Sequence, residues 1–230
     1  KLGSWTGKSC GANGKVSLKE ALAISCNTAF ASLGLELGAS AIYAQAKKFG
    51  FESSFDVPMT AATSHFPVDP NESQTAMSAI GQFDVRATAL QMAMVSAGIA
   101  NDGIVMRPYL VSQILGPDLS VLQNTTPLAF GRAMSSENAN VLRDMMVNVV
   151  SAGTGTNARI SGIVVGGKTG TAENTPGESA HAWFVGFAPA EGASIAIAVV
   201  LEHGGGATEV SGNALAAPIA AAVMKALLKQ

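Results

Sequence analysis

Three apolar segments lie close together in the last third of the chain, and the connections between them limit the possible folds. They cover residues 163–165, 182–187 and 194–201. A parallel pair of strands needs a crossover of about a dozen residues or more, whereas an antiparallel pair can be joined by a short turn. We therefore predict three successive antiparallel strands, over residues 163–173, 182–188 and 194–201.

Helix signals dominate the rest of the chain. Ser17, followed by Glu20 three residues later, has the form of a capping box and predicts the start of a helix. Gly38 and Gly50 are expected to end the next two helices, because glycine readily adopts the left-handed conformation at a helix C-terminus. The predicted helices cover residues 17–24, 27–37, 39–49, 72–80, 87–100, 136–150 and 213–228.

Turns and loops complete the expected architecture. Residues 109–115 and 119–123 flank a Gly-Pro-Asp turn at 116–118 and predict a hairpin. Residues 51–71 are rich in Ser, Thr, Pro and Asp and predict a long surface loop. Helices followed by a helix-flanked antiparallel sheet indicate an α+β fold. The sequence shows no repeats and no low-complexity linker, which indicates a single domain over residues 1–230.

Composition narrows the classes of function. Of the 230 residues, 48% are hydrophobic and 13% are charged, which favours a folded domain over disorder. The net charge of −2 offers no basic surplus for nucleic acid or for an anionic membrane surface. The nearest candidate for a membrane span, residues 214–228, is short and contains Pro218 and Lys225. The chain starts at Lys1 with neither a methionine nor a signal sequence, and we expect it to be part of a longer protein.

The two cysteines, Cys10 and Cys26, allow two interpretations. They could be two buried free thiols, or they could form one disulfide, which would place the protein outside the cytoplasm. Two cysteines alone do not decide between these alternatives.

A cluster of small and polar residues, Gly167 to Glu173, stands shortly before the second predicted strand. Lys168 supplies a point charge, and Thr169 and Thr171 supply hydroxyl donors. Gly170 lets a ligand backbone lie close to the strand. Together these residues predict an anion-binding site along one strand edge.

The same region also fits the phosphate-loop pattern G-x-x-x-x-G-K-[ST], from Gly162 to Thr169. The middle residues of such a loop curl around phosphates, but Ile163, Val164 and Val165 are β-branched and favour a strand. Thr169 would also have to open a helix, and the Pro-Gly pair at 176–177 argues against one. We therefore prefer a strand to a nucleotide site.

Gly7 to Gly11 matches the nucleophile-elbow pattern G-x-S-x-G. That motif needs a hydrophobic strand before it and a helix after it. Neither residues 1–6 nor residues 11–14 provide this context, so we predict a glycine-rich loop.

The triplet Ser25-Cys26-Asn27 lies between two predicted helices. Serine and asparagine favour helix caps, so the triplet alone is compatible with a simple helix junction. With the Lys-Thr-Gly box later in the same chain, it becomes a candidate site in which the hydroxyl of Ser25 and the amide of Asn27 face a cleft.

Three segments together resemble the transpeptidase domain of penicillin-binding proteins, of the monofunctional class B type that acts in cell division or elongation. Ser25 to Phe30 looks like the S-x-N motif and its helix. Residues 79–82, 88–93 and 100–103 are similar to the family's GQG, TPLQMA and ANGG segments. Gly167 to Glu173, with Trp183 to Pro189, resembles the K-T-G strand and its neighbour. The resemblance implies the α+β fold shared with serine β-lactamases.

The function implied by the resemblance is that of a peptidoglycan D,D-transpeptidase. In this family the serine of an S-x-x-K motif attacks the penultimate D-alanine carbonyl of a stem peptide, D-alanine leaves, and an amine of a second stem peptide attacks the acyl-enzyme. β-Lactams acylate the same serine. The implied partners are peptidoglycan stem peptides, β-lactam antibiotics and other cell-wall synthesis or division proteins, with no nucleic acid, cofactor or metal.

The resemblance also implies an extracytoplasmic location, in the periplasm or on the outer face of the cytoplasmic membrane, with any anchor upstream of this chain. That location favours the disulfide alternative, and we expect Cys10 and Cys26 to pair.

Individual roles follow from the resemblance by position. Ser25 would relay protons to the leaving nitrogen, and Asn27 would bind a substrate amide. Lys168 would supply positive charge near this relay and near the substrate carboxylate. The hydroxyls of Thr169 and Thr171 would hold that carboxylate beside Gly170. The backbone N–H of Thr171 would form half of an oxyanion hole.

The sequence departs from the family pattern in one respect. Neither serine nor threonine stands three residues before any lysine from Lys8 to Lys229. We therefore expect the S-x-x-K serine, and its half of the oxyanion hole, on a missing upstream segment, and we expect the chain alone to be inactive. Two other classes of protein remain possible. One is a serine β-lactamase, although no E-x-x-L-N motif occurs between the S-x-N and K-T-G motifs. The other is a non-catalytic β-lactam-binding, peptidoglycan-binding or sensor module.

Overall fold

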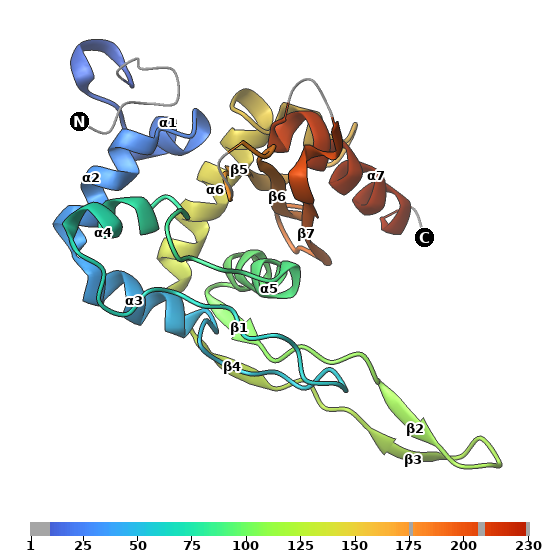
Figure 1. The fold of residues 1–230 in the computed structure, drawn as a ribbon. Coiled ribbons are helices and arrows are strands. Elements are labelled where there is room, and N and C mark those ends of the chain that lie inside the picture. The colour runs from blue at the N-terminus through green and yellow to red at the C-terminus, as the bar shows by residue number, and fades with distance from the viewer. Residues whose placement is uncertain (1–9, 175–176, 207–209, 229–230) are drawn as a thin grey trace.

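The computed structural model describes residues 10–174, 177–206 and 210–228 (Figure 1). The helices come mostly before the sheet, as the sequence predicted. They are α1 (Leu18–Ala23), α2 (Asn27–Leu37), α3 (Ala39–Lys48), α4 (Glu72–Ser78), α5 (Ala89–Ala100), α6 (Ser136–Ala152) and α7 (Ala217–Leu227). The strands are β1 (Ile104–Met106), β2 (Gln113–Leu115), β3 (Val121–Asn124), β4 (Ala129–Arg132), β5 (Gly166–Ala172), β6 (His181–Ala188) and β7 (Ile195–Leu201).

The central sheet has the strand order β5-β6-β7, and both pairs are antiparallel. Lys168 of β5 lies opposite Val185 of β6. Strand β5 is therefore one edge of this sheet, and among the described residues no other strand pairs with its outer side. The antiparallel prediction is confirmed, and so is the α+β fold class.

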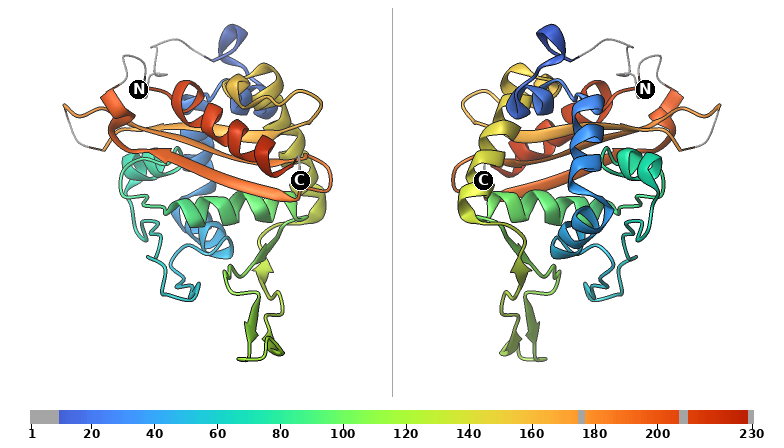
Figure 2. Two further views of the ribbon diagram at one scale, coloured as in Figure 1. Left: turned by 90° about the vertical axis from the view of Figure 1, so that its right-hand side faces the viewer. Right: turned by 90° about the vertical axis from the view of Figure 1, so that its left-hand side faces the viewer.

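Helices cover both faces of the sheet, with α7 on one face and α5 and α6 on the other (Figures 1 and 2). Successive side chains of a strand point to opposite faces. Accordingly, Phe184 packs into a core with Met224 of α7, whereas Phe187 packs into a second core with Ile99 and Met146. Burial of these large apolar side chains anchors β6, and β5 is attached to β6 through the antiparallel ladder.

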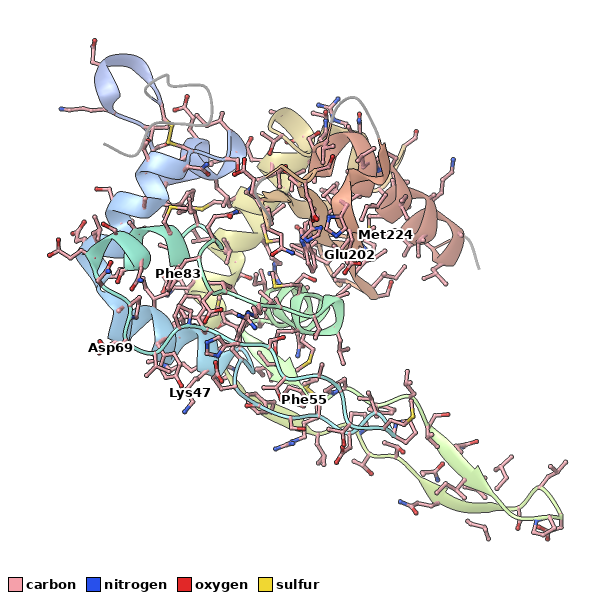
Figure 3. The ribbon with its side chains drawn as sticks, viewed as in Figure 1. Lys47, Phe55, Asp69, Phe83, Glu202 and Met224 are labelled. Carbon is pink, nitrogen blue, oxygen red and sulfur yellow. A yellow bond between two sulfur atoms is a disulfide. The ribbon has the colours of Figure 1, made fainter. Side chains whose placement is uncertain are left out.

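A third core lies away from the sheet, around Phe55 (Figure 3). It joins the loop over residues 51–71 to α5 and to the base of the β1–β4 pair through Met94, Val105 and Ala133. Residues 51–71 form the predicted loop, with only isolated bridges such as that of Asp56 with Thr60, but the loop does not lie wholly on the surface, because Phe55 and Phe66 are buried.

Most helix boundaries agree with the sequence prediction to within one or two residues. The Ser17 hydroxyl caps α1 by accepting a hydrogen bond from the N–H of Glu20, and α2 ends at Gly38, where φ is 82°. At the C-terminal end, the predicted helix begins with a π-helical turn, η4 (Gly212–Ala216), before α7 continues it. These ends were predictable because caps and glycines act locally.

The prediction that the first sheet strand begins at Ile163 is wrong. Strand β5 begins at Gly166, and Ile163 makes only an isolated bridge with Ile160 across a turn at Gly162. Continuing the β5–β6 register by two residues would place Val164 opposite Pro189, which has no N–H to give to a ladder. Residues 163–165 therefore follow the turn at Gly162 as an extended link that leads into β5 without belonging to it.

The predicted hairpin is confirmed as the β2–β3 pair, and it forms the outer part of an arm that projects from the body (Figures 1 and 2). The inner part is the β1–β4 pair, which the sequence did not predict. The arm exposes apolar side chains, among them Leu110, Leu119 and Leu122. Within the described ranges, no helix has the length and apolar character needed to cross a membrane.

Cys10 and Cys26 form a disulfide with their Cα atoms 6.1 Å apart, which confirms the expected pairing. Cys26 is buried and is the N-cap residue of α2, so the bond ties the segment before α1 to the start of α2. Of the glycine-rich segment at residues 7–11, only Cys10 and Gly11 belong to the described residues.

Candidate active site

Lys168 and Ser25 meet directly, although 143 positions separate them in the sequence. The Nζ atom of Lys168 donates one hydrogen bond to Oγ of Ser25 at 2.9 Å and another to the carbonyl oxygen of Thr169 at 2.7 Å. Lys168 comes from edge strand β5, and Ser25 from the short link between α1 and α2. The fold thus brings the two motifs found in the sequence to one place.

The backbone of Ser25 is in the left-handed region, with φ of 54°. Such a conformation is uncommon for a residue other than glycine and costs on the order of 1–3 kcal/mol. The N–H groups of Ser25 and Cys26 donate to the carbonyls of Leu22 and Ala21, which holds the turn closed. Together with the disulfide at Cys26, these bonds stabilise the turn that presents the Ser25 hydroxyl to Lys168.

Burial lowers the pKa of Lys168 from its ordinary value near 10.5 to about 8, because removal from water disfavours the charged ammonium. A lysine with this pKa changes its protonation state close to neutral pH. The hydroxyl of Ser25 is in hydrogen-bond contact with this amine.

Thr169 has a partner that the sequence analysis missed. Its Oγ1 lies 2.8 Å from Oγ1 of Thr154, in the segment that follows α6. The backbone N–H of Thr154 also donates to the carbonyl of Ala23, two residues before Ser25. The run of small residues and hydroxyls from Gly153 to Thr156, shortly after the helix predicted over residues 136–150, was the available signal.

Gly153 is required by close packing at this point. A Cβ atom there would lie 2.4 Å from the carbonyl oxygen of Ala23, a distance that real Cβ atoms essentially never show. The end of α6 therefore lies against the end of α1 only because residue 153 has no side chain.

The other predicted site residues are placed nearby by their elements. Asn27 is the first residue of α2, two positions from Ser25. Thr171 lies three positions along β5 from Lys168, opposite Ala182. Gly170 lies opposite Trp183, whose Cβ would be 3.1 Å from any added Cβ. In the described part of the chain, no side-chain hydrogen bond joins Asn27 or Thr171 to Lys168.

The structure excludes the phosphate-loop alternative. Strand β5 continues through Thr169 to Ala172, so no helix begins at Thr169, and its neighbour β6 is antiparallel. A phosphate loop needs a helix at that position to direct its N-terminus at the phosphates.

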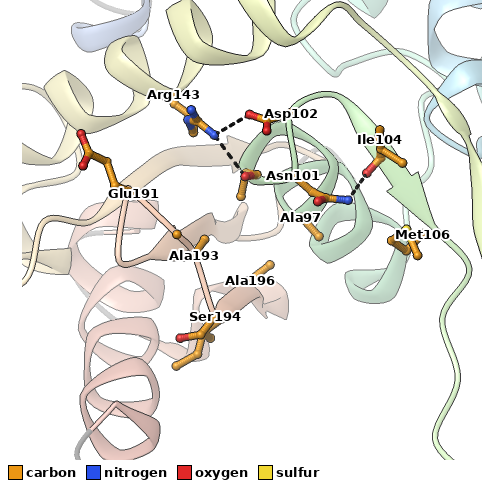
Figure 4. A pocket seen from close by; sticks show the side chains of 13 residues that line it. Ala97, Asn101, Asp102, Ile104, Met106, Arg143, Glu191, Ala193, Ser194 and Ala196 are labelled. Carbon is orange, nitrogen blue, oxygen red and sulfur yellow. Dashed lines mark hydrogen bonds and ion pairs between the residues drawn. The ribbon is translucent and has the colours of Figure 1, made fainter. Parts of the chain in front are cut away.

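A hollow lies elsewhere in the described part of the chain, between the end of α5, strand β1, helix α6 and the β6–β7 turn (Figure 4). It measures about 700 Å³ and contains none of the predicted site residues. Its cation, Arg143, already donates to Asp102 at 3.0 Å and to the carbonyl of Ala100 at 3.2 Å. The Lys168 edge differs from this hollow, because there a lysine of lowered pKa contacts a hydroxyl.

Comparisons with known proteins agree with the family resemblance found in the sequence motifs. Residues 1–225 match the family model described as the penicillin-binding protein transpeptidase domain. The chain is 43% identical over its whole length to the peptidoglycan D,D-transpeptidase PbpA of Mycolicibacterium smegmatis, and 40% identical to that of Mycobacterium tuberculosis. It covers 47% of each of these relatives.

Solved structures of similar proteins superpose closely on this chain. The ceftriaxone acyl-enzyme complex of penicillin-binding protein A from M. tuberculosis superposes with a TM-score of 0.93 at 40% identity, over 98% of this chain and 51% of that one. Its penicillin G acyl-enzyme complex superposes with a TM-score of 0.91, also at 40% identity, over 99% of this chain and 52% of that one. The chain thus spans about half the length of the relatives it matches.

Proposed function

Since the chain belongs to the penicillin-binding protein transpeptidase family, we propose that it forms the C-terminal portion of the transpeptidase domain of a peptidoglycan D,D-transpeptidase. The observation that carries this proposal is the hydrogen bond from Lys168 to Ser25. It joins the K-T-G strand to the S-x-N turn, as a site for serine acyl transfer requires.

In the proposed mechanism, a serine attacks the carbonyl of a stem peptide and the D-alanine amine leaves. Ser25 relays to the leaving nitrogen the proton that the attacking serine gives up, so Ser25 ends the step as a hydroxyl, and protonated Lys168, which donates to the Ser25 oxygen, holds that hydroxyl in place. Asn27 binds an amide of the substrate. The hydroxyls of Thr169 and Thr171 hold the substrate carboxylate along the β5 edge beside Gly170.

The oxyanion hole is assembled from two places in this proposal. The backbone N–H of Thr171 stabilises the negative charge that develops on the attacked carbonyl oxygen. The second N–H belongs to the attacking serine. No S-x-x-K motif occurs in these 230 residues, so we place that serine on a segment outside this sequence.

The alternative of a serine β-lactamase receives less support. The similar structures from M. tuberculosis are described as acyl-enzyme complexes with ceftriaxone, imipenem and penicillin G. An acyl-enzyme that persists long enough to be observed indicates slow deacylation, which a β-lactamase must avoid. A non-catalytic binding module is the third alternative, and acylation distinguishes it from both enzymes.

A location outside the cytoplasm is part of the proposal. The Cys10–Cys26 disulfide supports it, because such bonds persist in oxidising compartments and are rare in the cytosol. Cell-wall synthesis or division proteins are proposed as partners on the basis of family membership alone.

Labelling of the full-length protein with a fluorescent penicillin tests the function. A stable label is expected for a transpeptidase. Label that forms and is then lost by turnover would indicate a β-lactamase, and a complete lack of label would indicate a binding module.

A further inference from the structure

We propose that Thr154 is a positioning residue for the carboxylate subsite: its hydroxyl donates to Thr169 and thereby directs the Thr169 proton toward the carboxylate of a substrate or a β-lactam. The inference rests on the proposed function. Thr154 lies outside the three motifs that the sequence analysis identified.

The hydroxyls of Thr154 and Thr169 have two protons between them. Each hydroxyl has one proton, and the 2.8 Å contact between the two Oγ1 atoms uses one of the two. Among the described residues, neither side chain makes another hydrogen bond. One proton is therefore left for an external acceptor. If Thr169 is the group that donates to a carboxylate, then Thr154 must be the donor within the pair.

Hydrogen bonds in a chain polarise one another. A Thr169 hydroxyl that accepts from Thr154 is a better donor to an anion than an isolated hydroxyl. It is also restricted in rotation, so less freedom is lost when the carboxylate binds. Thr154 would thus act through Thr169 without touching the ligand.

The backbone around Thr154 is held firmly enough for this role. Its N–H donates to the carbonyl of Ala23 at 2.9 Å, and the N–H of Gly155 donates to the carbonyl of Val149 at 2.9 Å. These bonds do not involve the Thr154 side chain. Replacing the hydroxyl by a methyl group in Thr154→Val therefore removes the contact to Thr169 while leaving the backbone anchors in place.

A purely structural role makes a different prediction. If the Thr154–Thr169 contact only fastens the end of α6 to β5, its loss should lower stability and slow acylation equally for every β-lactam. A positioning role should affect only ligands that carry the carboxylate. The comparison of benzylpenicillin with its methyl ester separates the two, because the ester lacks the anionic group.

The test is the acylation rate constant of the full-length protein with both compounds. Thr154→Val should slow acylation by benzylpenicillin about tenfold, the effect expected for weakening one hydrogen bond to a charged group, and should change the rate with the ester less than about twofold. Thr154→Ser should restore the wild-type rate. Thr154→Val added to Thr169→Val should cause no further loss, because the first residue acts through the second.

The inference is overturned if Thr154→Val is acylated by benzylpenicillin at the wild-type rate, if both compounds slow equally, or if the two substitutions are additive. These outcomes leave the proposed function intact, since the wild type is still acylated. A wild-type protein that forms no adduct rejects the proposed function and this inference together.

Discussion

The Nζ atom of Lys168 donates a 2.9 Å hydrogen bond to the Oγ atom of Ser25, and burial lowers the pKa of this lysine to about 8. The contact joins the sheet edge to the turn between α1 and α2. Because the proposed role of Lys168 depends on its charge, the lowered pKa makes that role sensitive to pH in an accessible range.

Acylation of the full-length protein by benzylpenicillin should slow as the pH rises through about 8. Above this value Lys168 loses the charge that attracts the carboxylate, and its remaining N–H groups are weaker donors to Ser25. Lys168→Ala should cut the rate by orders of magnitude, whereas Lys225→Ala, on α7, serves as the control and should have no effect. A rate that rises through pH 8 would mean that the neutral amine is the active form.

Replacement of Lys168 by arginine tests whether the fall in acylation rate near pH 8 comes from titration of this residue. Lys168→Arg keeps a positive charge at every pH in the range, so its rate should be lower than that of the wild type but should not fall near pH 8. The same fall in the variant would assign the titration to another group.

Lys168 should lower the stability of the fold at neutral pH. Its pKa is lower in the folded protein than in the unfolded chain, so the unfolded chain binds more protons between pH 8 and 10.5 and the free energy of unfolding rises with pH over that window. Lys168→Met should raise the free energy of unfolding at pH 7 by on the order of 1–3 kcal/mol. Denaturant titrations of both proteins should converge by pH 10.5; a constant difference would contradict the prediction.

Residues 1–230 alone should form no covalent adduct with benzylpenicillin. No lysine from Lys8 to Lys229 has a serine or threonine three residues before it, so the sequence lacks the activated nucleophile of this family. Intact mass spectrometry is the measurement, with the full-length protein as the positive control. A stoichiometric penicilloyl adduct on any serine of these residues would show that the nucleophile is misplaced.

Gly153→Ala should destabilise the protein by about 1–3 kcal/mol and slow acylation, because its Cβ would lie 2.4 Å from the carbonyl oxygen of Ala23. Relief of that contact would shift the turn that carries Ser25. Gly131→Ala is a matched control on strand β4, since a Cβ there meets nothing within 4 Å. Equal unfolding free energies for the two variants would refute the close-packing argument.

The sequence predicted those parts of the fold that depend on local signals. Ser17 and Gly38 act through their own backbone environment, and the helices they bound were found within a residue or two. Residues 163–165 were misassigned because their β-branched side chains favour a strand, while the deciding constraint, a ladder position opposite Pro189, lies on another strand.

The site was predicted only in part, for a similar reason. Lys168 and Ser25 were paired by resemblance to a family, because nothing local in either motif reveals contact across 143 positions. Thr154 escaped notice, since its significance comes from tertiary contacts with Thr169 and Ala23.

Strand β7 has practical importance for anyone who handles these 230 residues in isolation. It forms the edge of the sheet opposite β5, and within the described residues only β6 pairs with it. Its residues, Ile195–Leu201, include no charge and no proline, the devices by which proteins usually keep exposed edges from pairing with other molecules. Solutions of the fragment should therefore scatter more light as concentration rises, and a lysine introduced near the middle of β7 should keep the fragment dispersed.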